Sequence, residues 1–223
     1  MDAVRRTAGG ICWILTALYV AVQPVVISAW RGDYDLSRNT ISDLGVTECG
    51  VFTQLGGDRV PVCSPRHNLM NTTFITVGLL MVAGSLLTRR GWPRRRTIAV
   101  AIWALIATGV GAVLIGVAPT NEYLALHAIG SVLQIPGSVA PLLVGIGLWR
   151  SQRPIAAFSV LVGMIGTIAT FLFLMGVYLG LGRGGMEHLG FDPLIVWLVV
   201  LGAAFATGRR LPGVRSTNTN SSI

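Results

Sequence analysis

The sequence predicts an all-α membrane protein, a bundle of six transmembrane helices whose two termini both lie in the cytoplasm. Six apolar stretches contain no Asp, Glu, Lys or Arg, so that every charged residue lies between or beyond them. A bilayer core about 30 Å thick needs roughly 20 apolar residues per helix, and a charge inside it costs a few kcal/mol. The composition agrees, because 52% of the residues are hydrophobic and 12% are charged. The stretches comprise residues 9–29, 69–87, 98–118, 123–149, 155–181 and 194–207.

The arginines orient this bundle. Short loops rich in basic residues stay in the cytoplasm, and the chain contains no lysine. With both termini inside, 12 of the 17 arginines lie on the inner side and eight of the nine acidic residues on the outer side. The net charge of +8 is therefore the topology signal of a multi-pass cell-membrane protein and not the footprint of a nucleic-acid-binding one. Membrane lipids are the expected partners, and the sequence specifies neither a protein partner nor an oligomeric state.

The first stretch is expected to be an uncleaved helix and not a secretory signal, because its apolar run is about 20 residues long and further spans follow it. The outer loop, residues 31–66, is too short and too poor in apolar residues to build a core of its own. We therefore assign residues 1–215 to a single transmembrane domain. The Ser/Thr/Asn-rich tail, residues 216–223, is expected to be disordered.

Two of the three cysteines, Cys49 and Cys63, fall in the outer loop, whereas Cys12 lies within the first helix. A disulfide is chemically permitted outside the cytoplasm. Closing a loop of about 15 residues stabilises a fold by roughly 3 kcal/mol in the chain-entropy model. We therefore predict a disulfide between Cys49 and Cys63, with Cys12 as a small buried side chain.

Helix starts are predicted from capping residues. Ser64 followed by Pro65 fits the N-cap and first residue of the second helix, and Asp192 followed by Pro193 fits those of the sixth. Thr120 is the expected cap of the fourth helix. The three histidines then lie toward the outer side, in the first turn of the second helix, about two turns into the fourth, and in the loop before the sixth. They are His67, His127 and His188.

The fourth helix carries a polar stripe, because His127, Ser131, Gln134 and Ser138 recur at helical spacing and share one face. At 1.5 Å per residue, Gln134 lies about 10 Å deeper than His127, where an amide that faces lipid is costly. The Gln134 side chain must therefore face protein or water. Two interpretations stay open: the stripe hydrogen-bonds neighbouring helices, or it forms the wall of a ligand cavity.

We expect these polar residues to line an outward-facing pocket that binds a lipid headgroup or a small amphiphile. The candidate liners are Asn39, Ser42, Asp43, His67, Asn71, Glu122, His127, Ser131 and Gln134. One alternative is a metal-dependent hydrolase at the same pocket, with zinc held by the three histidines, although no H-x-x-x-H or H-E-x-x-H spacing places two of them on one helix face. Another is a structural or partner-binding membrane protein in which these residues cap helices and hold the loop. The sequence favours a non-enzyme, and outside the zinc alternative we predict no cofactor.

Several blocks of the chain resemble a known family. The run Asn-Thr-Ile-Ser-Asp-Leu-Gly at 39–45 and the run Cys-Ser-Pro-Arg-His-Asn-Leu-Met-Asn at 63–71 are followed by further blocks at 116–122, 127–130 and 185–197. They resemble DUF998, a family of prokaryotic six-span membrane proteins of unknown function. The resemblance covers nearly the whole chain and implies the six-span topology and a polar cluster on the outer side, but no reaction.

This chain departs from the family pattern before the last helix. Where the family shows Glu-Arg and then Tyr-Pro, this sequence has Glu187-His188 and Asp192-Pro193. A fainter similarity, in the Ser-Asp-x-Gly loop and the histidine early in the fourth helix, extends to the Frag1, DRAM and Sfk1 group of six-span proteins. That similarity implies an association with lipid handling.

Overall fold

The computed structural model describes residues 2–53 and 59–207. Within them, six helical segments are long and apolar enough to cross a membrane, as the sequence predicts. The predicted tail, 216–223, and the last part of the predicted domain, 208–215, lie outside the described residues. The elements are α1 (Asp2–Leu15), α2 (Leu18–Ile27), the 3-10 helix η1 (Ser42–Gly45), β1 (Gly50–Thr53), β2 (Arg59–Val62), α3 (His67–Thr88), the 3-10 helix η2 (Arg89–Gly91), α4 (Arg96–Val117), α5 (Leu124–Leu148), α6 (Arg153–Leu174) and α7 (Gly182–Ala206).

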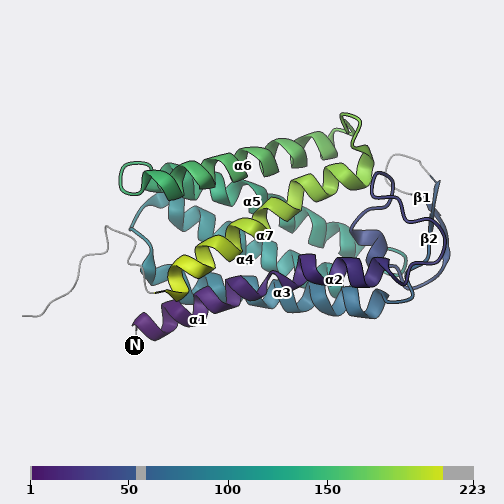
Figure 1. Ribbon diagram of the computed structural model, residues 1–223, viewed down its shortest axis with the longest axis horizontal. Helices are drawn as coiled ribbons and strands as arrows, with labels where there is room; N and C mark the ends of the chain where they lie inside the picture. The colour runs from purple at the N-terminus through teal and green to yellow at the C-terminus, as the bar shows by residue number, and fades with distance from the viewer. Residues whose placement is uncertain (1, 54–58, 208–223) are drawn as a thin grey trace, which may run out of the picture.

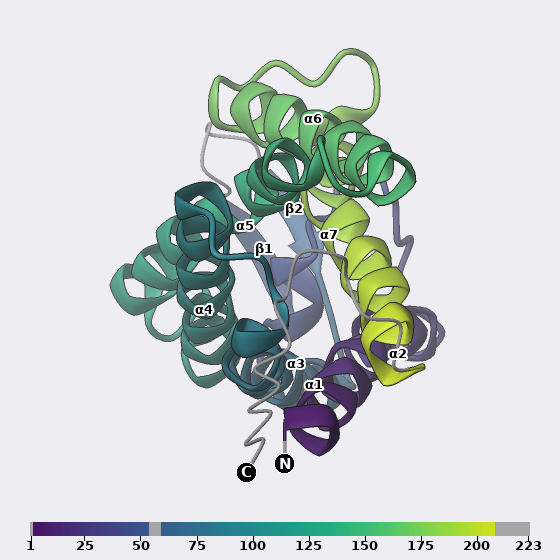
Figure 2. The ribbon, with the colours of Figure 1, turned by 90° about the vertical axis from the view of Figure 1, so that its left-hand side faces the viewer.

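The spanning helices run lengthwise along the molecule and form a closed ring (Figure 1). α4 packs against α3 and α5, α6 packs against α5 and α7, and α1 closes the ring between α7 and α3. Figure 2 shows this ring from the end opposite the β1–β2 hairpin. Where α1 crosses α7 the two backbones meet, because a Cβ on Gly10 would lie 2.5 Å from the Gly202 carbonyl oxygen. Small residues at such crossings allow close van der Waals packing between helices in a membrane.

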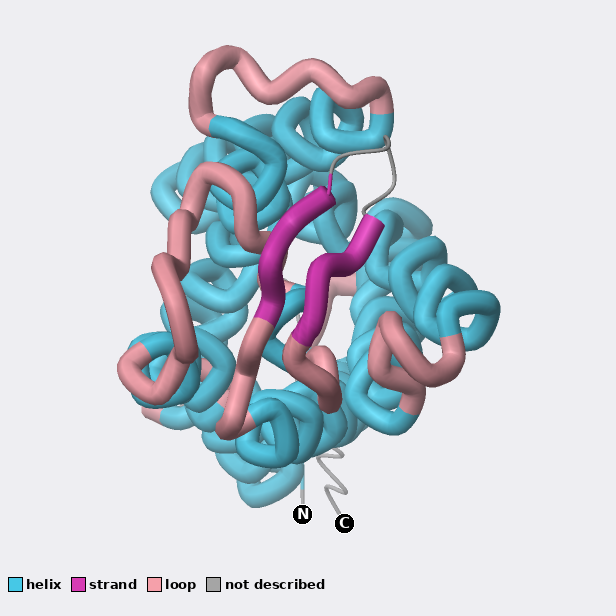
Figure 3. The backbone as a smooth tube through the Cα atoms, turned by 90° about the vertical axis from the view of Figure 1, so that its right-hand side faces the viewer, coloured by secondary structure: helices cyan, strands magenta, loops and turns pink. Residues whose placement is uncertain are grey.

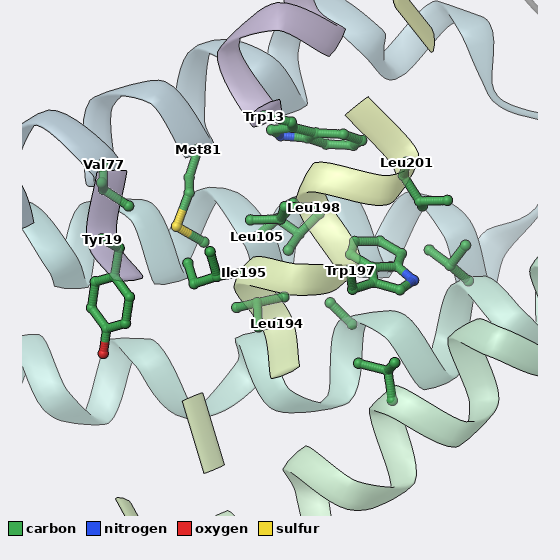
Figure 4. Close-up of a cluster of buried hydrophobic side chains, with 14 of the residues drawn as sticks. Trp13, Tyr19, Val77, Met81, Leu105, Leu194, Ile195, Trp197, Leu198 and Leu201 are labelled. Atoms are coloured by element: carbon green, nitrogen blue, oxygen red, sulfur yellow. The ribbon is translucent and has the colours of Figure 1, made fainter. Parts of the chain in front are cut away.

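Large side chains from α1, α3, α4 and α7 fill the centre of the ring (Figure 4). The fully buried Trp13 lies with its ring centroid 6.3 Å from that of Trp92 and 6.2 Å from that of Trp197. Trp197 donates its indole N–H to the Ser159 hydroxyl at 2.8 Å, which satisfies a donor that would otherwise be buried without a partner. This packing fastens α7 to α6 through Ser159 and to α1 through Trp13.

The first span is broken in the middle. α1 ends at Leu15 and α2 begins at Leu18, with a turn at Thr16 and Ala17 between them. The Thr16 hydroxyl donates to the Trp13 carbonyl oxygen at 2.6 Å. Such bonds from a threonine to its own helix backbone bend helices, and the sequence analysis did not predict the break.

The predicted start of the sixth helix is wrong. α7 begins at Gly182, so that Asp192 and Pro193 lie inside the helix and His188 is helical rather than in a loop. The preceding helix, α6, ends at Leu174 and not near residue 181. A proline is tolerated inside a membrane helix where neighbouring groups satisfy the freed carbonyl oxygen.

The other two predicted caps also bond elsewhere. α3 begins at His67, and the Ser64 hydroxyl donates to the Leu44 carbonyl oxygen at 2.7 Å instead of capping the helix. α5 begins at Leu124, and the Thr120 hydroxyl lies 3.3 Å from Nε2 of His127. Both hydroxyls thus connect separate segments of the chain.

Residues 28–53 and 59–66 fold over one end of the ring, which we call the loop end. Figure 3 shows the β1–β2 hairpin lying across this end. The two strands are antiparallel, with Gly50 opposite Val62, and the predicted Cys49–Cys63 disulfide joins their bases. The sequence analysis did not predict these short strands. Apolar side chains pack beneath the hairpin, namely Val46, Val60, Val62, Trp30 and Phe52.

Candidate functional site

The polar residues predicted from the sequence gather mainly around η1, which lies at the mouth of the ring beside α2 and α3. Asn71 on α3 donates its amide to the Gly45 carbonyl oxygen at 2.8 Å. Together with the bond from Ser64 to Leu44, this contact ties the C-terminal end of η1 to the start of α3. Asn71 is therefore buried and engaged with the loop backbone.

The N-terminal side of η1 is held by two carboxylates. Glu187 on α7 accepts a hydrogen bond from the backbone N–H of Ile41 at 2.6 Å. Asp43 accepts one from the backbone N–H of Thr40 at 2.8 Å. Both side chains are buried, so each bond satisfies a backbone N–H that would otherwise lack a partner away from water. The sequence analysis noted Glu187 only as a neighbour of His188, because it placed both in a loop.

Asn39 and Asp35 shape the turn that leads into η1. The Asn39 side-chain oxygen accepts from the Asp35 backbone N–H at 3.0 Å. The Asp35 carboxylate accepts from the hydroxyl and the backbone N–H of Ser37 and from the Arg38 guanidinium. These bonds, led by that of the Ser37 hydroxyl, lower the pKa of Asp35. Asn39 therefore contributes a local turn.

His127, near the start of α5, meets the loop through its ring nitrogens. Its Nδ1 lies 2.8 Å from the Ala118 carbonyl oxygen, which can only accept, so Nδ1 carries a proton. Its Nε2 lies 3.1 Å from the Ser42 hydroxyl and 3.3 Å from that of Thr120. The imidazole is buried, and Nε2 accepts a hydrogen bond from one of these hydroxyls.

The loop between α4 and α5 adds a second contact with the segment 28–66. The Thr47 hydroxyl donates to the Glu122 carboxylate at 2.6 Å, and the Thr47 backbone N–H donates to the Asn121 side-chain oxygen at 3.2 Å. Glu122 thus lies at the edge of the same network as His127.

Three of the predicted residues lie apart from that network. His67 contacts the Ser64 carbonyl oxygen through Nδ1 at 2.9 Å. Ser131 donates back to the His127 carbonyl oxygen in its own helix at 3.0 Å. Gln134 is half-buried deeper in α5 and lies against Gly111 on α4. Within the described ranges, no three His, Cys, Asp or Glu side chains gather as a metal-binding group, and His67, His127 and His188 each bond to different partners.

A separate groove of about 780 Å³ lies between α6, α7 and the loop end. Its lining is mostly apolar, with Leu36 of the loop, Val162 of α6 and Leu189 and Val196 of α7 among its residues. The polar side chains in it include His188 and Asp192, one helical turn apart, which the helix-start prediction had placed in and beside a loop. A correctly predicted helix would have put this pair on one face.

His188 and Asp192 form a hydrogen-bonded pair that is only partly satisfied. His188 Nδ1 lies 2.8 Å from Oδ2 of Asp192. His188 Nε2 and Asp192 Oδ1 are buried, and within the part of the chain that the structure describes neither has a hydrogen-bond partner. Such atoms are expected to find a partner in a ligand or in water.

Tyr34 of the loop extends this polar region. Its hydroxyl is buried and likewise lacks a hydrogen-bond partner among the described residues. Burial raises the pKa of Tyr34, and so do the nearby carboxylates of Glu187, Asp43 and Asp192. The Tyr34 hydroxyl and these carboxyl groups thus share one polar region.

The family model described as a protein of unknown function, DUF998, matches residues 14–204. The chain belongs to the DUF998 family. The matched region extends from within the first span to the end of the sixth, so this DUF998 protein is a multi-pass membrane protein by family and by fold. Among curated proteins and among solved structures, nothing matches the chain. The family has no assigned function, and the roles of individual residues must come from their geometry.

Proposed function

We propose that this protein binds a membrane lipid in the groove between α6 and α7. The observation that carries the proposal is the pairing of a mostly apolar groove of about 780 Å³ with two buried polar atoms that lack partners, His188 Nε2 and Asp192 Oδ1. An apolar groove in a membrane-spanning bundle is open to acyl chains, and the polar pair supplies a site for a headgroup or backbone group.

The extent of the groove fits one leaflet of a bilayer. It reaches from the turn at Gly180 and Leu181 down to Val162 on α6 and Val196 on α7. From His188 to Val196 the helix rises about 12 Å, which fits within half of a bilayer core, about 15 Å. An acyl chain in the lower groove would therefore leave the lipid's polar part near His188 and the loop end.

The polar pair favours a lipid that donates hydrogen bonds. Oδ1 of Asp192 is a buried acceptor without a partner, and Nε2 of His188 beside it accepts a hydrogen bond in the neutral ring and donates one in the protonated ring. A hydroxyl or amine group on the lipid would satisfy these atoms, each of which otherwise costs about 1–3 kcal/mol when buried without a partner.

The proposal moves the lipid site away from the pocket expected beneath the loop. There Asn71, Asp43 and Glu122 bond to the loop itself.

As part of the same proposal we orient both termini toward the cytoplasm, because 12 of the 17 arginines then lie on the inner side of the membrane. The groove then opens to the outer leaflet.

Photo-crosslinking tests the lipid site. Full-length protein is reconstituted in phosphatidylethanolamine vesicles that contain a diazirine-labelled acyl analogue, and crosslinked peptides are mapped by mass spectrometry. We expect adducts at Leu189 and Val196, and we expect Val196→Trp to abolish them by filling the groove. Val200→Trp is the matched control, because both valines lie exposed on α7 one turn apart and Val200 lies outside the groove lining.

The pattern of adducts decides the outcome. Adducts that are no denser in the groove than at lipid-facing Trp103 of α4, or that survive Val196→Trp unchanged, would overturn the proposal. His188→Gln tests how much the polar pair contributes to lipid binding apart from the apolar groove. We expect this variant to retain less hydroxyl- or amine-bearing lipid, while crosslinking to the acyl chain persists.

A further inference from the structure

We propose that Ser42 and His127 form a nucleophile and general-base pair that cleaves acyl esters at the loop end of the bundle. The two side chains come from segments 85 residues apart and meet at 3.1 Å between the Ser42 Oγ and the His127 Nε2. This distance falls within the hydrogen-bond reach that a serine nucleophile needs from its base. The inference concerns a different site from the lipid groove and does not depend on it.

The tautomer of His127 is the one that a general base requires. Because Nδ1 donates to the Ala118 carbonyl oxygen at 2.8 Å, the lone pair of the neutral ring lies on Nε2, toward Ser42. The carbonyl of Ala118 thus fixes the ring orientation, the role that a third group plays in hydrolytic triads.

The solvent exposure of the two residues suits a nucleophile and its general base. His127 is buried with 6% of its surface exposed, whereas Ser42 is partly exposed at the start of η1. The exposed part of Ser42 leaves this residue open to a reagent, whereas the base behind it is shielded from bulk water. His127 lies only three residues into α5, about 5 Å along the helix, so the pair lies near the membrane interface rather than at its centre.

The loop does not depend on this contact for its position. The N–H of Ile41 is held by Glu187, and the carbonyl oxygens of Leu44 and Gly45 are held by Ser64 and Asn71. With both ends of η1 fixed by these bonds, the bond between Ser42 and His127 adds little anchoring, which leaves a chemical role as the stronger explanation of the geometry.

The reaction balances with water as the only co-reactant. The Ser42 Oγ bonds to the ester carbonyl carbon as its proton passes to Nε2 of His127, and the ester C–O bond breaks as that proton passes to the leaving alkoxide. Water then gives a proton to Nε2 as its hydroxide bonds to the acyl carbon. The Ser42–acyl bond breaks as that proton passes from Nε2 to the Ser42 Oγ, which leaves a carboxylic acid, free Ser42 and neutral His127. The position at the interface points to acyl esters of lipids or amphiphiles as the substrate class.

Covalent labelling tests the pair directly. Detergent-purified full-length protein is treated with an alkyl fluorophosphonate, in which the Ser42 Oγ–P bond forms as fluoride leaves, and the modified residue is mapped by mass spectrometry. We expect a single adduct at Ser42, absent in Ser42→Ala. We expect His127→Gln to slow labelling by at least about 100-fold, since a positioned general base contributes about that much or more.

Matched variants separate chemistry from loop anchoring. Ser64→Ala removes another buried hydroxyl that holds η1, and it should leave the labelling rate within a few-fold of the unmodified chain. Thr120→Val tests the second hydroxyl near Nε2 and should leave Ser42 as the labelled residue. Val196→Trp, which fills the lipid groove, should not change the labelling, so that this inference and the proposed function fail separately.

Two results would overturn the inference. One is folded protein that gives no adduct at Ser42; the other is a Ser42 adduct that forms equally fast in His127→Gln. Should that variant fail to fold, the unmodified chain supplies the same information, because a base-assisted reaction slows as acidification protonates His127. A labelling rate that stays constant down to about two pH units below the ordinary histidine pKa of about 6.5 contradicts the pair.

Discussion

Replacing Glu187 by Leu is expected to release the loop at Ile41 without unfolding the helices. The Glu187 carboxylate accepts from the Ile41 backbone N–H at 2.6 Å, across 146 residues of chain, and both side chains are buried. Leu has a similar volume but no acceptor, so the N–H stays buried without a partner. Leaving a buried donor without its partner costs about 1–3 kcal/mol, and local opening of this segment should become easier by that amount.

Hydrogen exchange at the Ile41 amide measures this change, because local opening sets its exchange rate. A loss of about 1–3 kcal/mol corresponds to roughly 5- to 150-fold faster exchange. Glu187→Gln is the matched control, since its side-chain carbonyl oxygen still accepts from Ile41 and exchange should stay within a few-fold of the unmodified chain. Equal exchange in the Leu and Gln variants, with helix content unchanged by circular dichroism, would show that the contact does not hold the loop.

Three further outcomes are expected. Double replacement of Cys49 and Cys63 by Ala should lower the free energy of unfolding by about 3 kcal/mol in the chain-entropy model, measured by denaturant titration in detergent; an unchanged midpoint would contradict this. Trp197→Phe should cost about 1–3 kcal/mol in the same titration, because it leaves a buried serine hydroxyl without its donor. Asp33→Cys should react with an impermeant maleimide in intact cells if the loop end faces out, and protection until the cells are permeabilised would reverse the orientation.

The six spans were predictable because a charged residue costs free energy anywhere in the bilayer core, so that each predicted stretch lacks charged residues over its whole length. The same reasoning failed at the sixth helix, where Glu187, His188 and Asp192 lie within α7. These charged groups are tolerated because Glu187 bonds to the loop and His188 bonds to Asp192. Partners supplied by a distant segment cannot be read from a local pattern, and a capping signature such as Asp-Pro also occurs inside a helix.

For the candidate site, the residues that lie at the loop end could be predicted better than the contacts between them. Ser42 and His127 were predicted to line one pocket, but their contact depends on how η1 enters the ring, which tertiary packing determines. Asn71 and Glu122 come to the same end, where they bond to the loop backbone and to Thr47. Their residue types could not distinguish a ligand contact from a loop contact, because an amide or a carboxylate serves both equally well.

The two proposed sites share one segment of the loop. Ser37 lines the lipid groove, and Ser42, five residues later, faces His127. Between them Ile41 is held by Glu187, whose neighbour His188 lines the groove. The position of this segment should therefore affect both sites at once.

Glu187→Leu tests this coupling in one protein. If the Ile41 contact positions the segment, the variant should lose both the fluorophosphonate adduct at Ser42 and the acyl crosslinks at Val196, whereas Val196→Trp loses the crosslinks alone. Loss of one readout without the other in Glu187→Leu would show that the segment does not couple the sites. Because Glu187→Gln keeps the acceptor, it should retain both activities, which separates the effect of the hydrogen bond from that of any substitution at this position.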